Sequence, residues 1–471
     1  MVNRREFLTT IAAAASATVS PTGSSAAALS SGAMRSSGAS SSGAVAVNPA
    51  ALAINGGKPV RETPLWASEC GMGTEYYDDK ERGRLGDVVA SHNPFRWYGP
   101  GAEPPMQCAT FEKEFSERMQ GRYVLGVTSG TAALQVAMAA LGVGPGDEVI
   151  LPAWTWYSSY NAIVLAGALP VFAESDKSLN IDPEDIEHRI TPQTKAIMAV
   201  HLEGCPCDMD RILPIARKHG IKVLEDCAQS AGASYKGKPL GAIGDIAIYS
   251  FQLCKTITSG EGGCVVTGDP ILFERACRFH DLGPLRPQLE KQLGGQKVSA
   301  FAGTNFRMSE FTGGVLVAQL RKLDSIVAAL RANGRRVYEG LRDLPDPHFR
   351  LVSDPDGDLA ERVYLEFPTK QLRDRYIEAM KAENVPAGPP NGSVILPIDP
   401  MVENKVTAHP AWPSFTTPRG RAIRYGAEAC PRTIDILNRF ASVGIDPKFT
   451  QHDTEDIATA INKVYPVILQ A

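Results

Sequence analysis

The sequence predicts an α/β layer fold, with a large α/β domain followed by a smaller α+β domain at the C-terminus. Three observations support this expectation. At about 150 residues per domain, 471 residues correspond to two to four domains. Apolar residues make up 44% of the chain and charged residues 21%, as in soluble globular proteins. Between residues 111 and 226, apolar runs of strand length alternate with helical patterns, which indicates buried parallel strands separated by helices.

The first 50 residues are not expected to belong to this fold. Arg4 and Arg5 precede a weakly apolar run over residues 7–19 and a later small-residue site, a pattern similar to a twin-arginine export signal. The alternative is a chance pair of arginines in an amphipathic helix. The Ser/Gly/Ala-rich stretch that follows suits a flexible linker. We therefore assign residues 1–28 to an export signal and 29–50 to a linker. The expected location is periplasmic or secreted, or cytoplasmic if the signal is not used.

The elements of the large domain follow in order. A helix is expected over residues 111–119 and a strand over 123–127. A turn at 128–131 then leads into a helix over 132–141, which Gly142 ends. The remaining elements are a helix over 210–219 and four apolar runs bounded by polar turns, at 148–152, 169–173, 196–200 and 222–226.

The C-terminal part is expected to contain smaller elements. One long amphipathic helix is predicted over residues 308–344, where it would link the two domains. The last helix is predicted over 453–465, because Pro466 would end it. The predicted boundaries are 51–322 for an N-terminal arm with the large domain, and 323–471 for the linking helix with the small domain.

Charge and cysteine content restrict the class of protein. The 48 basic and 52 acidic residues give a net charge of −4, which is not the pattern of a nucleic-acid-binding protein. No run of about 20 apolar, uncharged residues appears, so membrane contact is expected only through the export signal. The nine cysteines include no pairs at the spacing of a zinc site. We therefore expect no metal site, and thiols that are buried and reduced.

Two polar segments follow predicted strands directly. In the first, residues 128–133, free backbone N–H groups at the helix start and the hydroxyls of Ser129 and Thr131 could bind an anion. The same hydroxyls could instead simply cap the helix. In the second, Asp226 ends an apolar strand, where ligands bind in open α/β sheets. A turn or cap aspartate is the alternative for that residue.

Two further segments contain candidate cationic groups. Lys255 lies among Leu253, Cys254 and Ile257, where loss of hydration would lower its pKa and make its amine nucleophilic. Most lysines are instead solvated. The other segment, residues 303–308, contains Arg307, which could clamp a carboxylate or phosphate or make a surface ion pair.

The order of the segments is more specific than any one of them. A phosphate-binding helix start, an aromatic residue, a strand-end aspartate and an apolar lysine are the parts that pyridoxal 5'-phosphate (PLP) requires. Six motifs carry the comparison further; they are SGTAAL from Ser129, PAWTW from Pro152, HLEGCPCDMD from His201, EDCAQ from Glu225, SFQLCK from Ser250 with GEGG, and GTNFRM from Gly303. With these motifs the chain, from about residue 52 to its C-terminus, resembles the DegT/StrS-type sugar aminotransferase family of the aspartate aminotransferase (type I) fold. The resemblance implies a three-layer large domain with a mixed, mostly parallel sheet.

The resemblance also implies roles for the site residues. Lys255 would form a Schiff base with PLP and move a proton between substrate and cofactor, and Asp226 would pair with the protonated pyridine nitrogen. Trp156 would stack on the cofactor ring, and Gln229 would contact its phenolic oxygen. The residues expected to bind the phosphate are Gly130, Thr131, Ser250 and, from the neighbouring subunit of a homodimer, Asn305. Ser129 is expected to remain a helix cap.

The implied function is transamination from an amino acid donor, glutamate or glutamine, to a keto sugar or keto-cyclitol. Gln252 stands where many family members have histidine and resembles the branch that acts on keto-cyclitols. The alternative is a sensor on the same fold that binds PLP or a sugar without turnover. The presence of Lys255 together with Asp226 and Trp156 favours the enzyme, and a dehydrating branch of the family carries histidine in place of this lysine.

Overall fold

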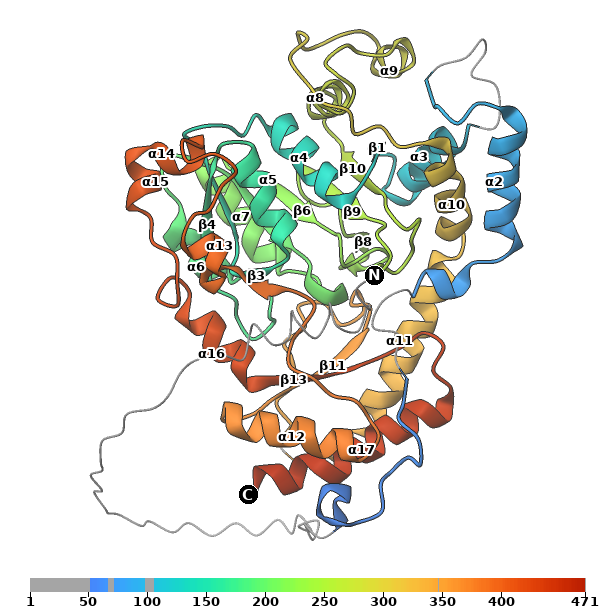
Figure 1. The fold of residues 1–471 in the computed structure, drawn as a ribbon, viewed down its shortest axis with the longest axis vertical. Coiled ribbons are helices and arrows are strands. Elements are labelled where there is room, and N and C mark those ends of the chain that lie inside the picture. Colours follow the sequence, from blue (N-terminus) through green and yellow to red (C-terminus); the bar gives the residue numbers. More distant parts are fainter. Residues whose placement is uncertain (1–50, 67–71, 98–105, 346, 471) are drawn as a thin grey trace. The chain divides into compact units, whose positions relative to one another are not determined.

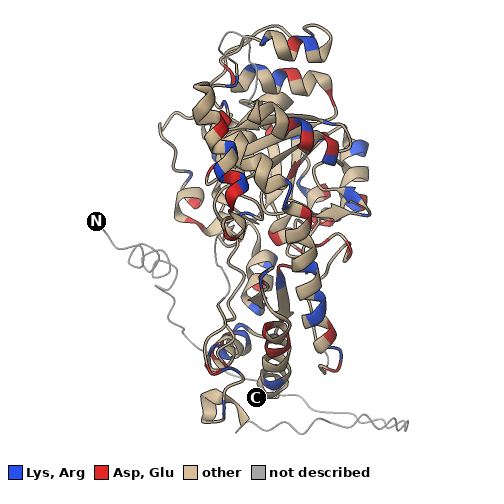
Figure 2. Cartoon of the chain, turned by 90° about the vertical axis from the view of Figure 1, so that its right-hand side faces the viewer, with Lys and Arg blue, Asp and Glu red and all other residues tan. Residues whose placement is uncertain are grey.

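The computed structural model describes residues 51–66, 72–97, 106–345 and 347–470, and these belong to one compact unit. The export signal and linker expected over residues 1–50 lie outside the described residues. Figure 2 shows basic and acidic residues interspersed along the described helices, in agreement with the nearly balanced charge of the sequence. None of the described helices combines the length and the apolar character that a bilayer-spanning segment needs.

A mixed seven-stranded sheet forms the core of the structure, in the strand order β1-β10-β9-β6-β5-β2-β4 (Figure 1). Strand β10 runs antiparallel to β1 and β9, and the other neighbours are parallel, as the resemblance implied. The predicted α/β fold class is therefore confirmed. The strands are β1 (Tyr123–Val127), β2 (Glu148–Pro152), β4 (Leu169–Ala173), β5 (Thr194–Val200), β6 (Lys222–Asp226), β9 (Ile246–Ser250) and β10 (Gly263–Thr267).

Alternate residues along these strands pack into two different hydrophobic layers, because successive side chains of a strand point to opposite faces. In β2, Val149 and Leu151 belong to one layer and Ile150 to the other. The first layer is completed by helices α4 (Gly130–Leu141), α5 (Tyr157–Leu165) and α8 (Pro270–His280). The second is completed by α3 (Gln107–Arg118), α6 (Pro183–Arg189), α7 (Met209–His219) and α10 (Glu310–Leu320).

A third hydrophobic cluster surrounds a two-stranded sheet of β11 (Arg362–Glu366) and β13 (Phe440–Gly444). The helices packed there are α11 (Leu323–Gly340), α12 (Lys370–Ala382) and α17 (Gln451–Leu469). The C-terminal part of the chain also contacts the region of the large sheet, because β12 (Val394–Ile395) pairs with β3 (Trp154–Thr155), next to Trp156. The division into domains at residues 322 and 323 stays a prediction.

The other elements are short or peripheral. They are η2 (Ala53–Asn55), η3 (Thr74–Tyr76), α2 (Asp79–Ser91), η4 (Leu202–Gly204), β7 (Ser234–Tyr235), β8 (Lys238–Pro239), α9 (Pro287–Leu293), η5 (Leu396–Ile398), α13 (Pro400–Glu403), α14 (Pro413–Thr416), α15 (Pro418–Ala422) and α16 (Pro431–Arg439).

Two helix predictions in the C-terminal part are wrong in their limits, and α3 begins four residues before the helix expected over 111–119. The single helix expected over 308–344 is two helices, because α10 is buried against α2 and α3 whereas α11 packs on α17. Lys322, between them, is 8% exposed, and its ammonium donates to Glu81 at 2.8 Å, which holds the break in place. The last helix does not stop before Pro466. It continues to Leu469, because the buried side chains that follow the proline pack into the third cluster and offset the lost hydrogen bond.

Candidate active site

The predicted site residues lie where the central strands end. Asp226 ends β6 and Ser250 ends its parallel neighbour β9, and Gly130 begins α4 directly after β1. Because the carboxyl ends of parallel strands share one edge of the sheet, the topology gathers these residues from distant parts of the sequence.

The start of α4 forms a tight cradle with Ser250. Ser129 caps the helix, since its hydroxyl accepts from the Ala132 N–H at 3.0 Å, and the cap predicted for it is confirmed. A Cβ added to Gly130 would lie 2.6 Å from the Ser250 Cβ, so only glycine allows this approach. The Thr131 hydroxyl lies 2.7 Å from that of Ser158. The cradle thus combines a helix N-terminus with several hydroxyl groups, which is the chemistry of a phosphate site.

Asp226 is a buried carboxylate, 3% exposed, that accepts two hydrogen bonds. The Ser159 hydroxyl donates to it at 3.0 Å and the Ala228 N–H at 3.1 Å. Burial raises the pKa of Asp226, and these hydrogen bonds and the charge of Lys255 only partly oppose that effect. A cation bound against this carboxylate would stabilise its ionised form.

Lys255 is partly buried in the loop after β9. Burial lowers the pKa of its amine, although the carboxylates of Asp226 and Glu361 act in the opposite direction. The loop is closed by backbone hydrogen bonds, from the Phe251 N–H to the Gly262 carbonyl at 2.8 Å and from Leu253 to Gly260 at 3.0 Å. An amine held in this way, with a lowered pKa, is a better nucleophile than a solvated lysine.

Trp156 and Gln229 differ in how free their side chains are. The indole of Trp156 is 53% exposed just before α5 and makes an edge contact with Tyr157, at 5.6 Å between ring centroids. It therefore offers an open aromatic face. The amide of Gln229 is held on both sides, because its Oε1 accepts from the Glu203 N–H at 3.1 Å and its Nε2 donates to Ser393 Oγ at 3.2 Å.

The segment of Asn305 and Arg307 pairs with the end of β1. The Thr128 N–H donates to the Phe306 carbonyl at 3.0 Å, and Asn305 itself is exposed. Arg307 forms an ion pair with the buried Asp281 at 2.6 Å, so the ion-pair alternative holds for it in this chain. The contribution of Asn305 to a neighbouring subunit stays a prediction.

The cysteine prediction is correct for seven residues and wrong for one. Seven described cysteines are free and buried, and burial raises the pKa of their thiols. Cys254, the residue before Lys255, is instead disulfide-bonded. Sequence spacing could not reveal this bond, because disulfide formation depends on which cysteines the fold brings together. Cys70 lies outside the described residues.

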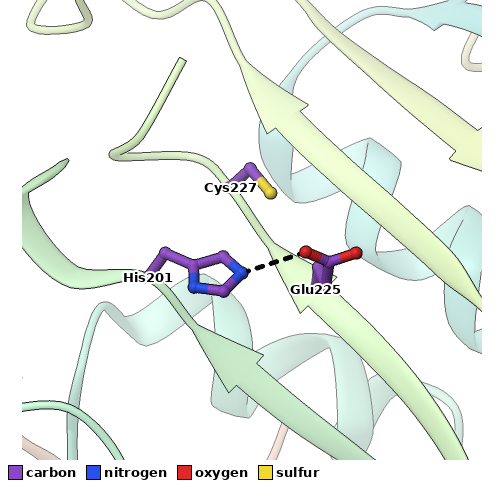
Figure 3. A group of neighbouring side chains, drawn as sticks. All are labelled: His201, Glu225 and Cys227. Atoms are coloured by element: carbon purple, nitrogen blue, oxygen red, sulfur yellow. Dashed lines mark hydrogen bonds and ion pairs between the residues drawn. The ribbon is translucent and has the colours of Figure 1, made fainter. Parts of the chain in front are cut away.

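One buried group in the described chain has the composition of a metal site. Figure 3 shows His201, Glu225 and Cys227, whose potential ligand atoms lie within 4.8 Å of one another. The Cys207 N–H donates to His201 Nδ1 at 3.0 Å, so the ring proton must be on Nε2, which donates to Glu225 at 3.2 Å. Both ring nitrogens are therefore engaged in hydrogen bonds. Burial alone would raise the pKa of Glu225, but His201 and two backbone N–H groups hold it low. These bonds give the group a structural role beside Asp226.

The sequence missed several residues that contact the predicted site residues, among them Ser159 and Glu203. Ser159 supports Asp226 and lies three positions after Trp156 on the same helix turn, a spacing that could have indicated it. Glu203 contacts Gln229 and lies within the motif that begins at His201, but its partners in β11 have no local signal.

Residues 103–462 match the sequence model of the DegT/DnrJ/EryC1/StrS aminotransferase family. Among solved structures, 3-amino-5-hydroxybenzoic acid (AHBA) synthase is 27% identical at a TM-score of 0.70, over 86% of this chain and 100% of that one. An aminotransferase from Psychrobacter cryohalolentis is 29% identical at a TM-score of 0.69, over 83% and 98% of the two chains. DesV of S. venezuelae, solved with a ketimine intermediate, is 28% identical at a TM-score of 0.65, over 82% and 94%.

Proposed function

The chain belongs to the DegT/DnrJ/EryC1/StrS aminotransferase family and is an aminotransferase, and we propose that it transfers an amino group from an amino acid to a keto sugar or keto-cyclitol with PLP as cofactor. One observation carries this proposal: a lysine of lowered pKa lies within the electrostatic reach of a buried strand-end carboxylate, Asp226. Members of the family depend on PLP, and the described residues fit that group. Glycine at position 130 lets Ser250 lie against the start of α4, where backbone N–H groups and a hydroxyl could bind a phosphate, and burial raises the pKa of Asp226 despite the charge of Lys255.

When bound, PLP supplies an electron sink for the carbanion formed during transfer of the amino group. The residues of this chain would attach the cofactor and move the protons. The amine of Lys255 would hold the cofactor covalently and then carry the proton between the substrate carbon and the cofactor. Asp226 would keep a proton on the pyridine nitrogen, because its ionised form is stabilised by a cation and destabilised without one.

The remaining residues would bind and orient the cofactor. Trp156 offers an exposed indole for stacking, and Gly130, Thr131 and Ser250 offer the phosphate cradle. The amide of Gln229 would contact the phenolic oxygen of the ring.

The acceptor and the donor are the finer part of the proposal. Glutamate or glutamine is the donor we expect. The acceptor class is supported by the similar proteins, one of which is AHBA synthase, and another is DesI solved with its TDP-sugar product, at 25% identity. Gln252 does not narrow the acceptor further, because its Oε1 accepts from the Cys254 N–H at 2.8 Å and its amide thus serves the lysine loop.

Two parts of the proposal concern assembly and location. We propose a homodimer in which Asn305 of one subunit reaches the phosphate site of the other. Mixing Lys255→Ala subunits with Asn305→Ala subunits should then restore activity in the hybrid dimers that keep one intact site. We also propose export through residues 1–28, which mass spectrometry of the mature N-terminus would test.

Lys255→Ala decides the central proposal. Wild-type protein is expected to be yellow with PLP and to change absorbance when a donor is added, and a panel of keto sugars should then reverse the change. The variant should lose turnover and the covalent absorbance band. Lys218→Ala, at an exposed lysine, is the matched control and should keep both. A Lys255→Ala protein that still transaminates would refute the mechanism, and a wild type that binds PLP but responds to no donor would favour a sensor.

A further inference from the structure

Glu203 is a buried carboxylate at the edge of the site, 5% exposed, in the short 3-10 turn η4. Its backbone has φ 51° and ψ 52°, in the left-handed region that residues with a long side chain rarely adopt. Such a conformation is strained and persists only where surrounding contacts determine it. The contacts around Glu203 are therefore expected to have a function.

Two segments that are distant from Glu203 in the sequence, β11 and the chain before β12, contact its carboxylate. Its Oε2 accepts a hydrogen bond from the Tyr364 hydroxyl, and its Oε1 lies 3.1 Å from Arg362 Nε, both in β11. The carboxylate also contacts the backbone before β12, where a Cβ added to Gly392 would lie 2.3 Å from Oε1. Glycine is thus required at that position while the carboxylate is in place.

The same turn fixes the amide of Gln229. The backbone N–H of Glu203 donates to Gln229 Oε1 at 3.1 Å, and Gln229 Nε2 donates to the Gly392 carbonyl at 3.3 Å and to Ser393 Oγ at 3.2 Å. One side of the amide is therefore held by Glu203 itself, and the other by the segment that packs on its carboxylate. An amide bound in this way cannot rotate by 180° without losing these bonds.

We propose that Glu203 is a positioning residue that fixes the orientation of the Gln229 amide toward the cofactor. This inference rests on the proposed function, in which Gln229 contacts the phenolic oxygen of PLP. That oxygen accepts hydrogen bonds, so the amide must present its N–H₂ group and not its carbonyl. Arg362 and Tyr364 bind the carboxylate of Glu203 and so stabilise the strained turn. In that turn, the backbone N–H of Glu203 donates to Gln229 Oε1. Nε2 has two hydrogens, which donate to the Gly392 carbonyl and to Ser393 Oγ, so one of these bonds would be exchanged for a bond to the phenolic oxygen when the cofactor binds.

A double-mutant cycle tests whether Glu203 acts through Gln229. Glu203→Gln removes the charge and keeps the length, and Gln229→Ala removes the amide. The dissociation constant for PLP is measured by absorbance titration in all four proteins. We expect Glu203→Gln to weaken PLP binding about tenfold when Gln229 is intact, and by less than about twofold in the Gln229→Ala background, because the two residues act as one unit. The pH midpoint of the cofactor band should likewise move only when Gln229 is present.

Tyr364→Phe keeps the test decisive if Glu203→Gln fails to fold. It removes only the hydroxyl that donates to Glu203, so binding should weaken about threefold, again only when Gln229 is present. Tyr376→Phe is the matched control, since the buried Tyr376 hydroxyl has no hydrogen-bond partner among the described residues and lies in the third cluster. Equal effects with and without Gln229, or no effect at all, would overturn the positioning role. Failure of the wild type to bind PLP would instead overturn the proposed function.

Discussion

Replacement of Asp226 by asparagine should have opposite effects on activity and on the stability of the cofactor-free protein. Asparagine keeps the shape of the side chain. Its carbonyl can still accept from the Ala228 N–H, and its amide can donate to the Ser159 hydroxyl, at the positions of bonds that now measure 3.1 and 3.0 Å. The substitution therefore removes a buried charge and little else.

The size of the activity loss follows from the burial of the charge. Removal of one partner of a buried charge pair costs about 2–5 kcal/mol, and 3 kcal/mol corresponds to a rate loss of about 150-fold. We therefore expect kcat to fall by about 30-fold or more in Asp226→Asn, with about 150-fold as the central value. Ser159→Ala is the matched control: it removes one hydrogen bond of about 1 kcal/mol to the same carboxylate, so its loss should be about fivefold.

Asp226→Asn should increase the stability of the cofactor-free protein, although it lowers activity. Burial raises the pKa of Asp226 above that of the unfolded chain, so its contribution to stability is present at acidic pH and is lost as the pH rises through the folded pKa. Without cofactor, Asp226→Asn should accordingly raise the free energy of unfolding at pH 7 and leave it nearly unchanged at pH 3. Urea denaturation at the two pH values measures this, and steady-state kinetics measures kcat. A cofactor-free variant that is less stable at pH 7, or a kcat within tenfold of wild type, would refute the reasoning.

Three further predictions concern other parts of the chain. Trp156 is 53% exposed, so Trp156→Ala should change the unfolding free energy by less than about 0.5 kcal/mol while weakening PLP binding about fivefold. Trp154, which is 1% exposed, is the comparison: urea titration of Trp154→Ala should show a loss of about 3–5 kcal/mol in the unfolding free energy. Burial lowers the pKa of His280 to about 4, so stability should be full above pH 6.5 and fall by up to about 3 kcal/mol towards pH 4, and His280→Gln should abolish this slope. Cys254→Ser, or reduction by dithiothreitol, should lower the unfolding free energy by about 2–4 kcal/mol, and a serine variant that still responds to the reductant would contradict the disulfide.

Much of the fold was readable from local pattern. The strands at 123–127, 148–152, 169–173 and 222–226 have the predicted limits, because a buried strand is a largely apolar run bounded by polar turns, whether it is parallel to its neighbours or, like 123–127, antiparallel. The cap at Ser129 was readable for the same reason, since a cap is a contact between neighbours in sequence. The position of Asp226 at the end of a strand was likewise predictable, and it made Asp226 a candidate because ligands bind at that edge of an α/β sheet.

The limits of two helices and the turn at Glu203 depend on contacts between residues that are distant in the sequence. The break before α11 depends on Lys322 binding Glu81, and the extension of α17 past Pro466 depends on the third hydrophobic cluster. The turn at Glu203 depends on Tyr364, 161 residues further along the chain. By itself the sequence determined the α/β class, the position of Asp226 at the end of a strand and the family, because these rest on local periodicity and short motifs. Only the tertiary structure decided how the Gln229 amide is held and which cysteine is oxidised, because both depend on side chains that folding brings together from separate segments.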